Sequence, residues 1–408
     1  MTYNFDEIID RRNTNSENVE GWRPYIFHCG PERVFPYKDE EFIRMWVADM
    51  EFAVAPEILQ AITDRVHRRI LGYTLVYDKG YYEVLRAWCE SRYGWSFPKE
   101  QLTFSPGVIP ALYQLTEDLV KPLNGKVLTM TPAYGFFLHA CEYNGVELVT
   151  SPLREEGGRF SIDWEDLEAK AADPDVKLLM LCNPHNPTGR IWTEEELRHM
   201  AAIIEKHRLW VVSDEIHCDL IRTGLRHTPL GKIMPDYDRL ITCMSASKTF
   251  NLAGLVGSYH IIYNPYLRDR VRAKSSKPHY NDMNVLSMHA LIGAYKPEGY
   301  EWVEELRETI SGNVNFACDY ITQHFEGVSV SKPEGTYMLF LDCTDWCKAH
   351  GKIIAEVEKA GWNVGVAWQD GRMFHGPCAI RMNLALPLTR VQEAFERLDK
   401  YVFNGEWV

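Results

Sequence analysis

A lysine follows a run of small residues in the segment Ser245-Ala246-Ser247-Lys248-Thr249. The apolar run 240–244 before it predicts a buried strand, and the small residues predict a turn where that strand ends. Because open α/β sheets bind ligands at the carboxyl ends of their strands, this spacing places an amine at a ligand site. Burial disfavours the charged form of lysine, and the neutral amine is a nucleophile. On its own, the segment is equally compatible with a solvated surface lysine.

Four further segments that follow predicted strands carry side chains or backbone N–H groups suited to binding or catalysis. Asn186 lies in 183–190 after the strand 177–182, Asp214 follows the strand 209–213, and Tyr134 lies in 131–137 after the strand 126–130. Gly107 and Val108 open a helix after the strand 102–104. The free N–H groups at such a helix start favour an anion such as phosphate. We expect the sheet to gather these segments on one edge.

This combination suits an aldehyde cofactor that has a pyridine ring and a phosphate. Such a cofactor needs an amine that bonds to the aldehyde and a carboxylate that keeps the ring nitrogen protonated. It also needs a hydrogen bond to the ring hydroxyl, an aromatic ring against its face and an anion cradle. Lys248 is the candidate amine, Asp214 the carboxylate, and Asn186 the partner of the ring hydroxyl. Tyr134 is the candidate aromatic ring, and the Gly107 and Val108 amides with Ser245 are the candidate anion cradle. Taken singly, each also fits a cap, a turn residue or core packing.

The chain of 408 residues is longer than one hydrophobic core usually supports, so two domains are expected. Apolar strands alternate with amphipathic helices from about residue 100 to 263. This alternation predicts an α/β fold whose mostly parallel sheet is covered by helices on both faces. The pattern changes after residue 285, where short strands and helices predict a smaller α+β domain. We therefore expect a large domain at 45–285, and a small domain formed by 286–408 with the amino-terminal arm 1–44.

Several local signals predict individual elements. The segment 45–50 reads as a short strand that leads into a loop, and apolar residues at a spacing of four from Ile58 to Ile70 predict a helix that starts at Pro56. Thr193 with Glu196 has the spacing of a capping box, as does Thr389 with Gln392.

Composition excludes several classes of function. The formal net charge of −13 argues against non-specific nucleic-acid binding. No apolar run reaches the length of a transmembrane helix, and the amino terminus lacks the features of a signal peptide, so a cytoplasmic enzyme that does not bind membranes is expected. The 10 cysteines are scattered without paired spacings, so we expect neither a metal site nor disulfides.

The chain resembles fold-type I pyridoxal-phosphate enzymes of the class I/II aminotransferase group, and within it the MalY/PatB branch of cystathionine β-lyases. The segments that carry the resemblance are 5–16, 45–50, 183–189, 213–217, 247–255 and 334–337, with Arg381. The resemblance implies pyridoxal 5'-phosphate and a homodimer with shared active sites. It implies that Tyr73 reaches the partner's cofactor phosphate, that Ser247 and His217 contact the cofactor, and that Arg381, Ala48 and Asn186 contact the substrate. A guanidinium fork at Arg381 matches an α-carboxylate.

Two departures from the aminotransferase pattern favour the lyase branch. The aminotransferase group usually has a tyrosine where this chain has His217, and it often has a phosphate-binding arginine where this chain has Val256. The phosphate would then rest on backbone amides, Ser245, Ser247 and Tyr73.

We therefore expect a C–S β-lyase that cleaves cystathionine or a related cysteine thioether to a thiol, pyruvate and ammonia, with Lys248 as the base at Cα. An aminotransferase using the same lysine is the alternative. A regulatory binding protein that acts through a protein partner is a third possibility.

Overall fold

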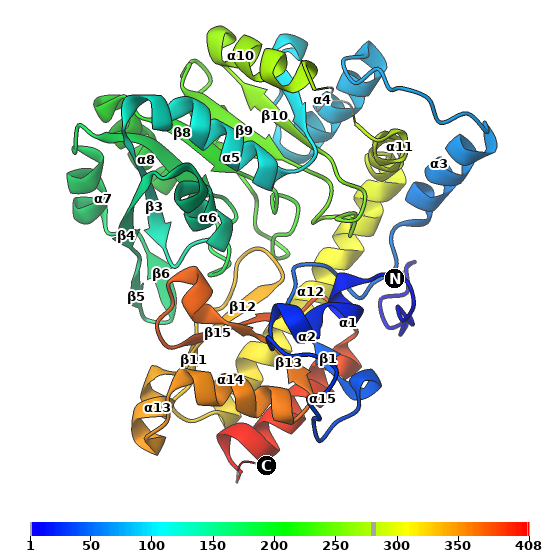
Figure 1. Ribbon diagram of the computed structural model, residues 1–408, viewed down its shortest axis with the longest axis vertical. Coiled ribbons are helices and arrows are strands. Elements are labelled where there is room, and N and C mark those ends of the chain that lie inside the picture. The colour runs from blue at the N-terminus through cyan, green and yellow to red at the C-terminus, as the bar shows by residue number, and fades with distance from the viewer. Residues whose placement is uncertain (1, 279–282, 406, 408) are drawn as a thin grey trace.

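A seven-stranded sheet forms the larger part of the protein in the computed structural model, which describes residues 2–278, 283–405 and 407. Figure 1 shows this sheet above a smaller one. In spatial order its strands are β2 (Leu102–Ser105), β10 (Ser258–Ile262), β9 (Leu240–Met244), β8 (Trp210–Asp214), β7 (Val176–Cys182), β3 (Lys126–Thr131) and β4 (Glu147–Pro152). Only β10 runs antiparallel to its neighbours. The predicted mostly parallel sheet is confirmed.

Helices cover both faces of this sheet, which is why β7 and β9 are almost wholly apolar. Alternate residues of β7 face opposite sides: Leu178 and Met180 belong to one apolar cluster, and Leu179 and Leu181 to the other. One face packs against α5 (Val108–Leu119), α6 (Gly135–Asn144) and α10 (Pro265–Ser276). The other packs against α7 (Trp164–Ala171), α8 (Glu194–His207) and α9 (Leu230–Ile233).

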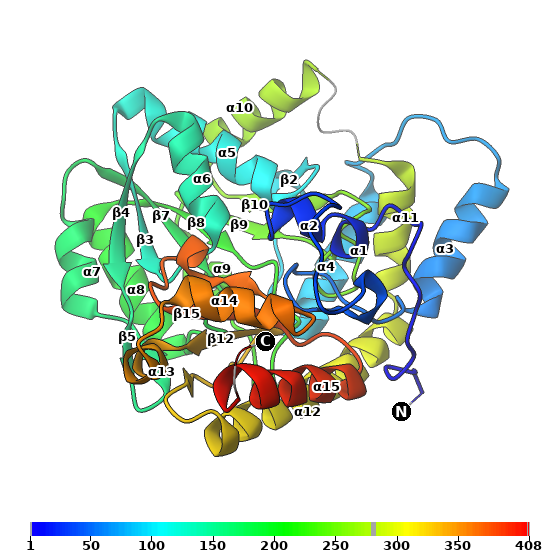
Figure 2. The same cartoon turned by 60° about the horizontal axis from the view of Figure 1, so that its bottom comes forward.

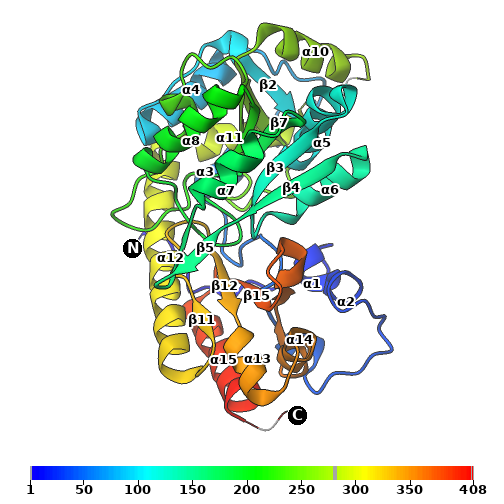
Figure 3. The same cartoon turned by 90° about the vertical axis from the view of Figure 1, so that its left-hand side faces the viewer.

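A second, antiparallel sheet lies below the first, and the long helix α12 (Pro297–His324) runs beside both (Figure 3). Its strands, in spatial order, are β11 (Ser329–Val330), β12 (Met338–Asp342), β15 (Ala379–Asn383) and β14 (Gln369–Asp370). Helices α13 (Thr344–His350), α14 (Ile354–Asn363) and α15 (Leu388–Leu398) accompany it, with η4 (Gly371–Phe374) and η5 (Asp399–Phe403). Figure 2 shows α15 alongside α12.

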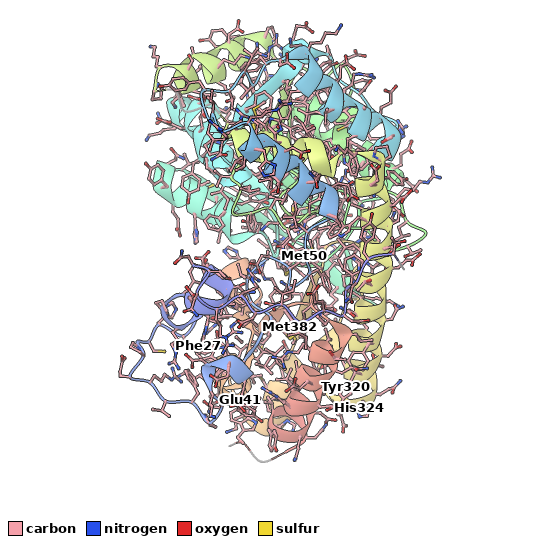
Figure 4. All side chains as sticks on the ribbon, turned by 90° about the vertical axis from the view of Figure 1, so that its right-hand side faces the viewer. Phe27, Glu41, Met50, Tyr320, His324 and Met382 are labelled. Carbon is pink, nitrogen blue, oxygen red and sulfur yellow. The ribbon has the colours of Figure 1, made fainter. Side chains whose placement is uncertain are left out.

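The amino-terminal arm joins the part of the chain that contains the second sheet. It comprises α1 (Glu17–Glu20), α2 (Trp22–Tyr25), η1 (Asp39–Glu41) and β1 (Ile43–Arg44). Strand β1 pairs in parallel with β13 (Val366–Ala367), which joins the amino-terminal arm to the carboxyl-terminal part of the chain. Met50, just after the arm, lies between the two halves of the molecule (Figure 4).

The remaining elements flank the large sheet. Helix α3 (Pro56–His67) packs on α11 (Val285–Ala294), and α4 (Lys79–Tyr93) covers the neighbouring core. The others are η2 (Lys99–Gln101), η3 (Lys121–Leu123) and the hairpin β5 (Arg154–Glu156) with β6 (Arg159–Ser161).

Three local expectations were wrong. The segment 45–50 contains no strand, because only Met45 bonds to the backbone of β13 and β15, and the carbonyl oxygens of Val47 and Asp49 accept hydrogen bonds from the Asn383 side chain instead. Helix α3 ends at His67, so Ile70 lies outside it and is 75% exposed. Helix α15 begins after Pro387 without a capping box at Thr389, whereas the box at Thr193 and Glu196 is confirmed.

The domain boundaries at 44/45 and 285/286 stay predictions. Over the described ranges, no helix combines the length and apolar character needed to cross a bilayer.

Candidate active site

A cavity of about 280 Å³ opens at the carboxyl ends of β7, β8 and β9. Its lining comes from loops that are far apart in the sequence, as the position of the strand ends predicted. Of the predicted site residues, it brings together Ala48, Gly107, Val108, Tyr134, Asn186, Asp214, His217, Ser245, Ser247 and Lys248. Arg381 and Tyr73 are not part of this lining.

Lys248 follows β9 and a turn held by two serines. Its Nζ donates a hydrogen bond to the carbonyl oxygen of Ala48 at 2.7 Å. Burial lowers the pKa of Lys248 to about 8, because the charged ammonium loses its water; the carboxylate of Asp49 opposes this change. A large fraction of this amine is therefore neutral near pH 8, which is the form that reacts as a nucleophile or base.

Asp214 is the last residue of β8, and its side chain is almost completely buried. Burial raises the pKa of its carboxyl group to about 7, although the Ile216 N–H donates to Oδ1 at 3.2 Å and favours the ionised form. A cationic group placed in this cavity would compensate the buried charge. Asp214 is thus suited to hold a protonated ring nitrogen.

His217 lies three residues further along and is also buried. Desolvation lowers its pKa to about 3, and the nearby charges of Lys248 and Arg381 act in the same direction. Its Nδ1 atom is buried and has no hydrogen-bond partner within the described parts of the chain. This neutral ring can therefore offer a hydrogen bond to a bound group.

The opposite side of the cavity has the features of an anion site. Helix α5 begins at Val108, and no side chain caps its free N–H groups. The hydroxyls of Ser245 and Ser247 are 3.0 Å apart and line the same cavity. A Cβ atom at Gly107 would meet only Pro110 at 3.5 Å, so the protein itself leaves room there for a group near the backbone. These observations fit a phosphate at the start of a helix.

Asn186 connects the cavity to Arg381. The Nη1 of Arg381, a buried side chain on β15, donates to Asn186 Oδ1 at 3.3 Å, and Nη2 donates to the carbonyl oxygen of Trp46 at 2.9 Å. Nη2 also donates to Gln369 Oε1. The Nε of Arg381 is buried without a partner within the described chain, so the guanidinium retains a donor for a further acceptor.

Tyr134 is the residue before α6, and burial raises its pKa well above the usual range of a phenol. It therefore stays neutral and presents an aromatic ring to the cavity. Tyr73 differs from every other predicted site residue, because its side chain is 99% exposed. It borders a second hollow with Ser105 and Val256, next to the first cavity, which Val256 also lines.

Sequence reasoning missed several residues at the site. Tyr337 donates from its hydroxyl to the same Ala48 carbonyl at 3.0 Å, and its ring lies 6.0 Å from that of His217. Cys182 and Ile216 line the cavity. Ile216 was detectable as the apolar residue in the Asp214–His217 motif; Tyr337 and Gln369 lie on distant segments, whose approach no local signal predicts.

Comparisons with known proteins agree with this geometry. The chain is 35% identical over 358 residues to cystathionine β-lyase PatB of Bacillus subtilis (strain 168), covering 87% of this chain and 91% of that one. It is 28% identical over 396 residues to protein MalY of Escherichia coli (strain K12), covering 96% of each. The crystal structure of a PLP-bound C-S lyase from Staphylococcus hominis superposes with a TM-score of 0.89 at 37% identity, covering 98% of each chain.

The family model for aminotransferase class I and II matches residues 40–398, a span that includes every cavity residue named above. It also includes the segments that carried the resemblance from residue 45 onward. The chain therefore belongs to the aminotransferase class I and II family and is similar in sequence and structure to its C–S lyase members.

Proposed function

We propose that this protein is a pyridoxal-phosphate-dependent C–S β-lyase. The observation that carries the proposal is the placement of the Lys248 amine in one cavity with the buried Asp214 carboxyl group. The similarity to PatB and to the Staphylococcus hominis lyase supports the reaction class. The substrates would be cystathionine or related cysteine thioethers, and the products a thiol, pyruvate and ammonia.

The cavity residues divide into groups that would hold different parts of the cofactor. Lys248 would bond to the aldehyde carbon, and Asp214 would hold the ring-nitrogen proton. Asn186 and His217 would donate hydrogen bonds near the ring, with Tyr134 against its face. The amides at Gly107 and Val108, with Ser245 and Ser247, would hold the phosphate. Bound pyridoxal phosphate supplies an electron sink that makes the substrate Cα proton removable.

Two residues would then act on the substrate. Arg381 binds the α-carboxylate, using its free Nε and the Nη1 that contacts Asn186. The substrate amine would first displace Lys248 from the aldehyde carbon, and the freed Nζ of Lys248, a neutral amine, would then accept the Cα proton. The Cβ–S bond then breaks, and the sulfur leaves with the bonding electron pair as a thiolate. Hydrolysis of the remaining three-carbon unit consumes one water and gives pyruvate and ammonia.

A homodimer with shared sites is part of the proposal. The nearly complete exposure of Tyr73 supports it, since an aromatic ring in open water gains nothing within one protomer. In the dimer, Tyr73 of each chain would contact the cofactor phosphate of the partner. A cytoplasmic location and a regulatory role through a protein partner stay predictions.

The aminotransferase reaction is the second candidate, and membership of the aminotransferase class I and II family favours it. It needs the same lysine, but returns the proton to the cofactor carbon while the Cβ substituent stays in place. A difference of about 1.4 kcal/mol between the two barriers gives tenfold partitioning.

The deciding experiment incubates the holoenzyme with L-cystathionine in the absence of any 2-oxo acid. Continuous release of pyruvate and thiol is the expected result for a lyase. A single turnover that stalls, and resumes only when a 2-oxo acid is added, would replace the proposal with the aminotransferase.

A further inference from the structure

The residue after Lys248 is tied to a carboxylate outside the cavity. The hydroxyl of Thr249 donates to Asp219 Oδ2 at 3.0 Å, and both side chains are buried, at 0% and 2% exposure. Asp219 does not line the cavity. It follows β8 by five residues and lies two residues beyond His217. The contact therefore links the loop after β8 with the loop after β9, next to the reactive lysine.

The carboxylate of Asp219 also accepts hydrogen bonds from two residues of helix α4. Its Oδ1 accepts a hydrogen bond from Arg92 Nε at 3.1 Å and one from the hydroxyl of Tyr93 at 2.5 Å, both near the end of α4. Arg92 also binds Glu304 of α12 at 2.5 Å. Three donor atoms from two parts of the chain, the end of α4 and the loop after β9, thus hold the carboxylate of Asp219. Such a network, buried and satisfied, keeps a fixed geometry.

The other side of Lys248 is fixed by a separate set of contacts. The backbone N–H of Ser247 donates to Ser245 Oγ at 3.1 Å, and Ser245 Oγ donates to the carbonyl oxygen of Gly257 at 2.8 Å. Lys248 itself makes its side-chain contact with Ala48. The lysine backbone is therefore anchored by the serines before it and by the Thr249–Asp219 bond after it.

We propose that Asp219 is a positioning residue for Lys248, which it orients through its hydrogen bond with Thr249. The inference rests on the proposed role of Lys248 in the reaction. Proton transfer requires the amine within hydrogen-bonding reach of the reacting carbon, and a small displacement of a reacting group costs orders of magnitude in rate. Loss of the Thr249 hydroxyl leaves one buried lone pair of Asp219 unsatisfied and frees the chain next to the lysine.

The test compares Thr249→Val, which keeps the side-chain shape, with Thr249→Ser, which keeps the hydroxyl. Thr249→Val is expected to lower kcat about tenfold or more while KM changes by less than about threefold, because positioning acts on the chemical step. Thr249→Ser is expected to stay within about threefold of the wild-type kcat. The matched control is Thr116→Val on α5, which also removes a fully buried hydroxyl, one that donates to Leu112 O at 2.8 Å.

A second readout does not depend on turnover. The absorbance of the lysine-bound cofactor is titrated against pH in each holoenzyme. If Thr249→Val displaces Lys248, the pH midpoint of this absorbance change is expected to shift in that variant. The midpoint should stay at the wild-type pH in Thr249→Ser and Thr116→Val. Thermal unfolding separates this effect from lost stability, since both valine variants lose a buried hydrogen bond.

The double variant locates the effect. If Asp219 acts through Thr249, the Thr249→Val substitution should lower kcat much less in the Asp219→Asn background than in the wild-type background. A wild-type kcat and an unchanged absorbance midpoint in Thr249→Val would overturn the inference, even if Asp219→Asn fails to fold. If the wild type releases no pyruvate, the lyase proposal fails, while the absorbance titration still decides whether Thr249 positions the lysine.

Discussion

Burial sets the ionisation of the two most reactive groups at the residue scale. It lowers the pKa of Lys248 to about 8 and raises that of Asp214 to about 7, so the two values approach each other. In water these groups would be separated by more than six pH units. The cavity therefore holds an amine that can lose its proton and a carboxyl group that retains one until a cationic partner arrives. Desolvation alone thus favours the neutral amine of Lys248 and the protonated carboxyl group of Asp214 before any ligand binds.

Replacement of Lys248 by alanine is expected to lower turnover by at least about 1000-fold, because one residue is both the covalent partner of the cofactor and the base. Folding should be largely retained, since the amine makes a single hydrogen bond, to Ala48, with the described parts of the chain. Pyruvate release and circular dichroism measure the two effects, with the exposed Lys206→Ala variant as control. Near wild-type turnover in Lys248→Ala would exclude the proposed chemistry.

Asp214→Asn is expected to have opposite effects on the cofactor-free protein and on the holoenzyme. The raised pKa means that the folded protein keeps a proton between about pH 4 and pH 7 that the unfolded chain has released. The free energy of unfolding therefore falls as pH rises through this window. Asparagine removes that penalty, so the variant without cofactor should be more stable at pH 8 by about 1 to 4 kcal/mol.

Urea denaturation of the cofactor-free proteins at pH 8 and pH 4 measures this difference, which should largely vanish at the lower pH. In the holoenzyme the same variant should lose activity, because the ring nitrogen has no anionic partner. Equal stability of the two cofactor-free proteins at pH 8 would mean that the Asp214 charge is compensated in another way.

At the scale of elements, the turn after β7 connects the cavity with the second sheet. Gly189 has a φ of 71°, and its carbonyl oxygen accepts hydrogen bonds from the N–H groups of Glu334 and Gly335 at 2.8 and 2.7 Å. The turn thereby positions Asn186 in the cavity against the segment that leads to Tyr337. A left-handed backbone and a close approach both require glycine at this point.

Gly189→Ala is expected to destabilise the protein by more than about 3 kcal/mol and to lower activity, because strain and a steric overlap combine. An added Cβ would lie 2.2 Å from Pro333 Cβ and 2.9 Å from the Gly335 carbonyl oxygen. Gly224→Ala is the matched control: φ there is 85°, but nothing lies within 4 Å of the added atom. It should cost only about 1 kcal/mol, from strain alone. Thermal unfolding of the two variants tests the difference, and equal losses would show that the overlap with Pro333 relaxes.

At the scale of the whole molecule, apolar side chains remain exposed along the segment after α3. Leu71, Tyr73 and Leu75 are 57%, 99% and 72% exposed, and Val256 beside the cavity is 56% exposed. A patch of this kind next to a site favours association with another chain. Two-fold symmetry would place the same segment of each protomer at the site of the other.

Mixing Tyr73→Ala protein with Lys248→Ala protein is expected to restore activity if each site uses Tyr73 of the partner. Random exchange makes half of the dimers mixed, each with one intact site of two, so about a quarter of the wild-type activity should return. Pyruvate release measures the recovery, and native mass spectrometry confirms that mixed dimers form. Mixed dimers without activity would contradict the shared site.

Local sequence pattern was sufficient to predict those parts of the protein that a single segment defines. Fully buried parallel strands are continuous apolar runs, so β7 and β9 were predicted to within one residue. Asp214 is the last residue of β8, and Asn186 and Lys248 each lie four residues beyond the end of a strand. The rule that ligands bind where strands end then predicted a common cavity. The end of helix α3 and the cap of helix α15 were less predictable. Ile70 lies outside α3, and Thr389 forms no capping box.

Contacts between segments far apart in the chain become visible only in the folded protein. The acceptor for Lys248 is a carbonyl 200 residues away, and Arg381 contacts Asn186 across 195 residues. The altered pKa values of Lys248 and Asp214 come from burial by many segments together, which no single motif encodes. The bond between Thr249 and Asp219 was hidden for the same reason: two loops, each ordinary in sequence, meet only because β8 and β9 are neighbours in the sheet.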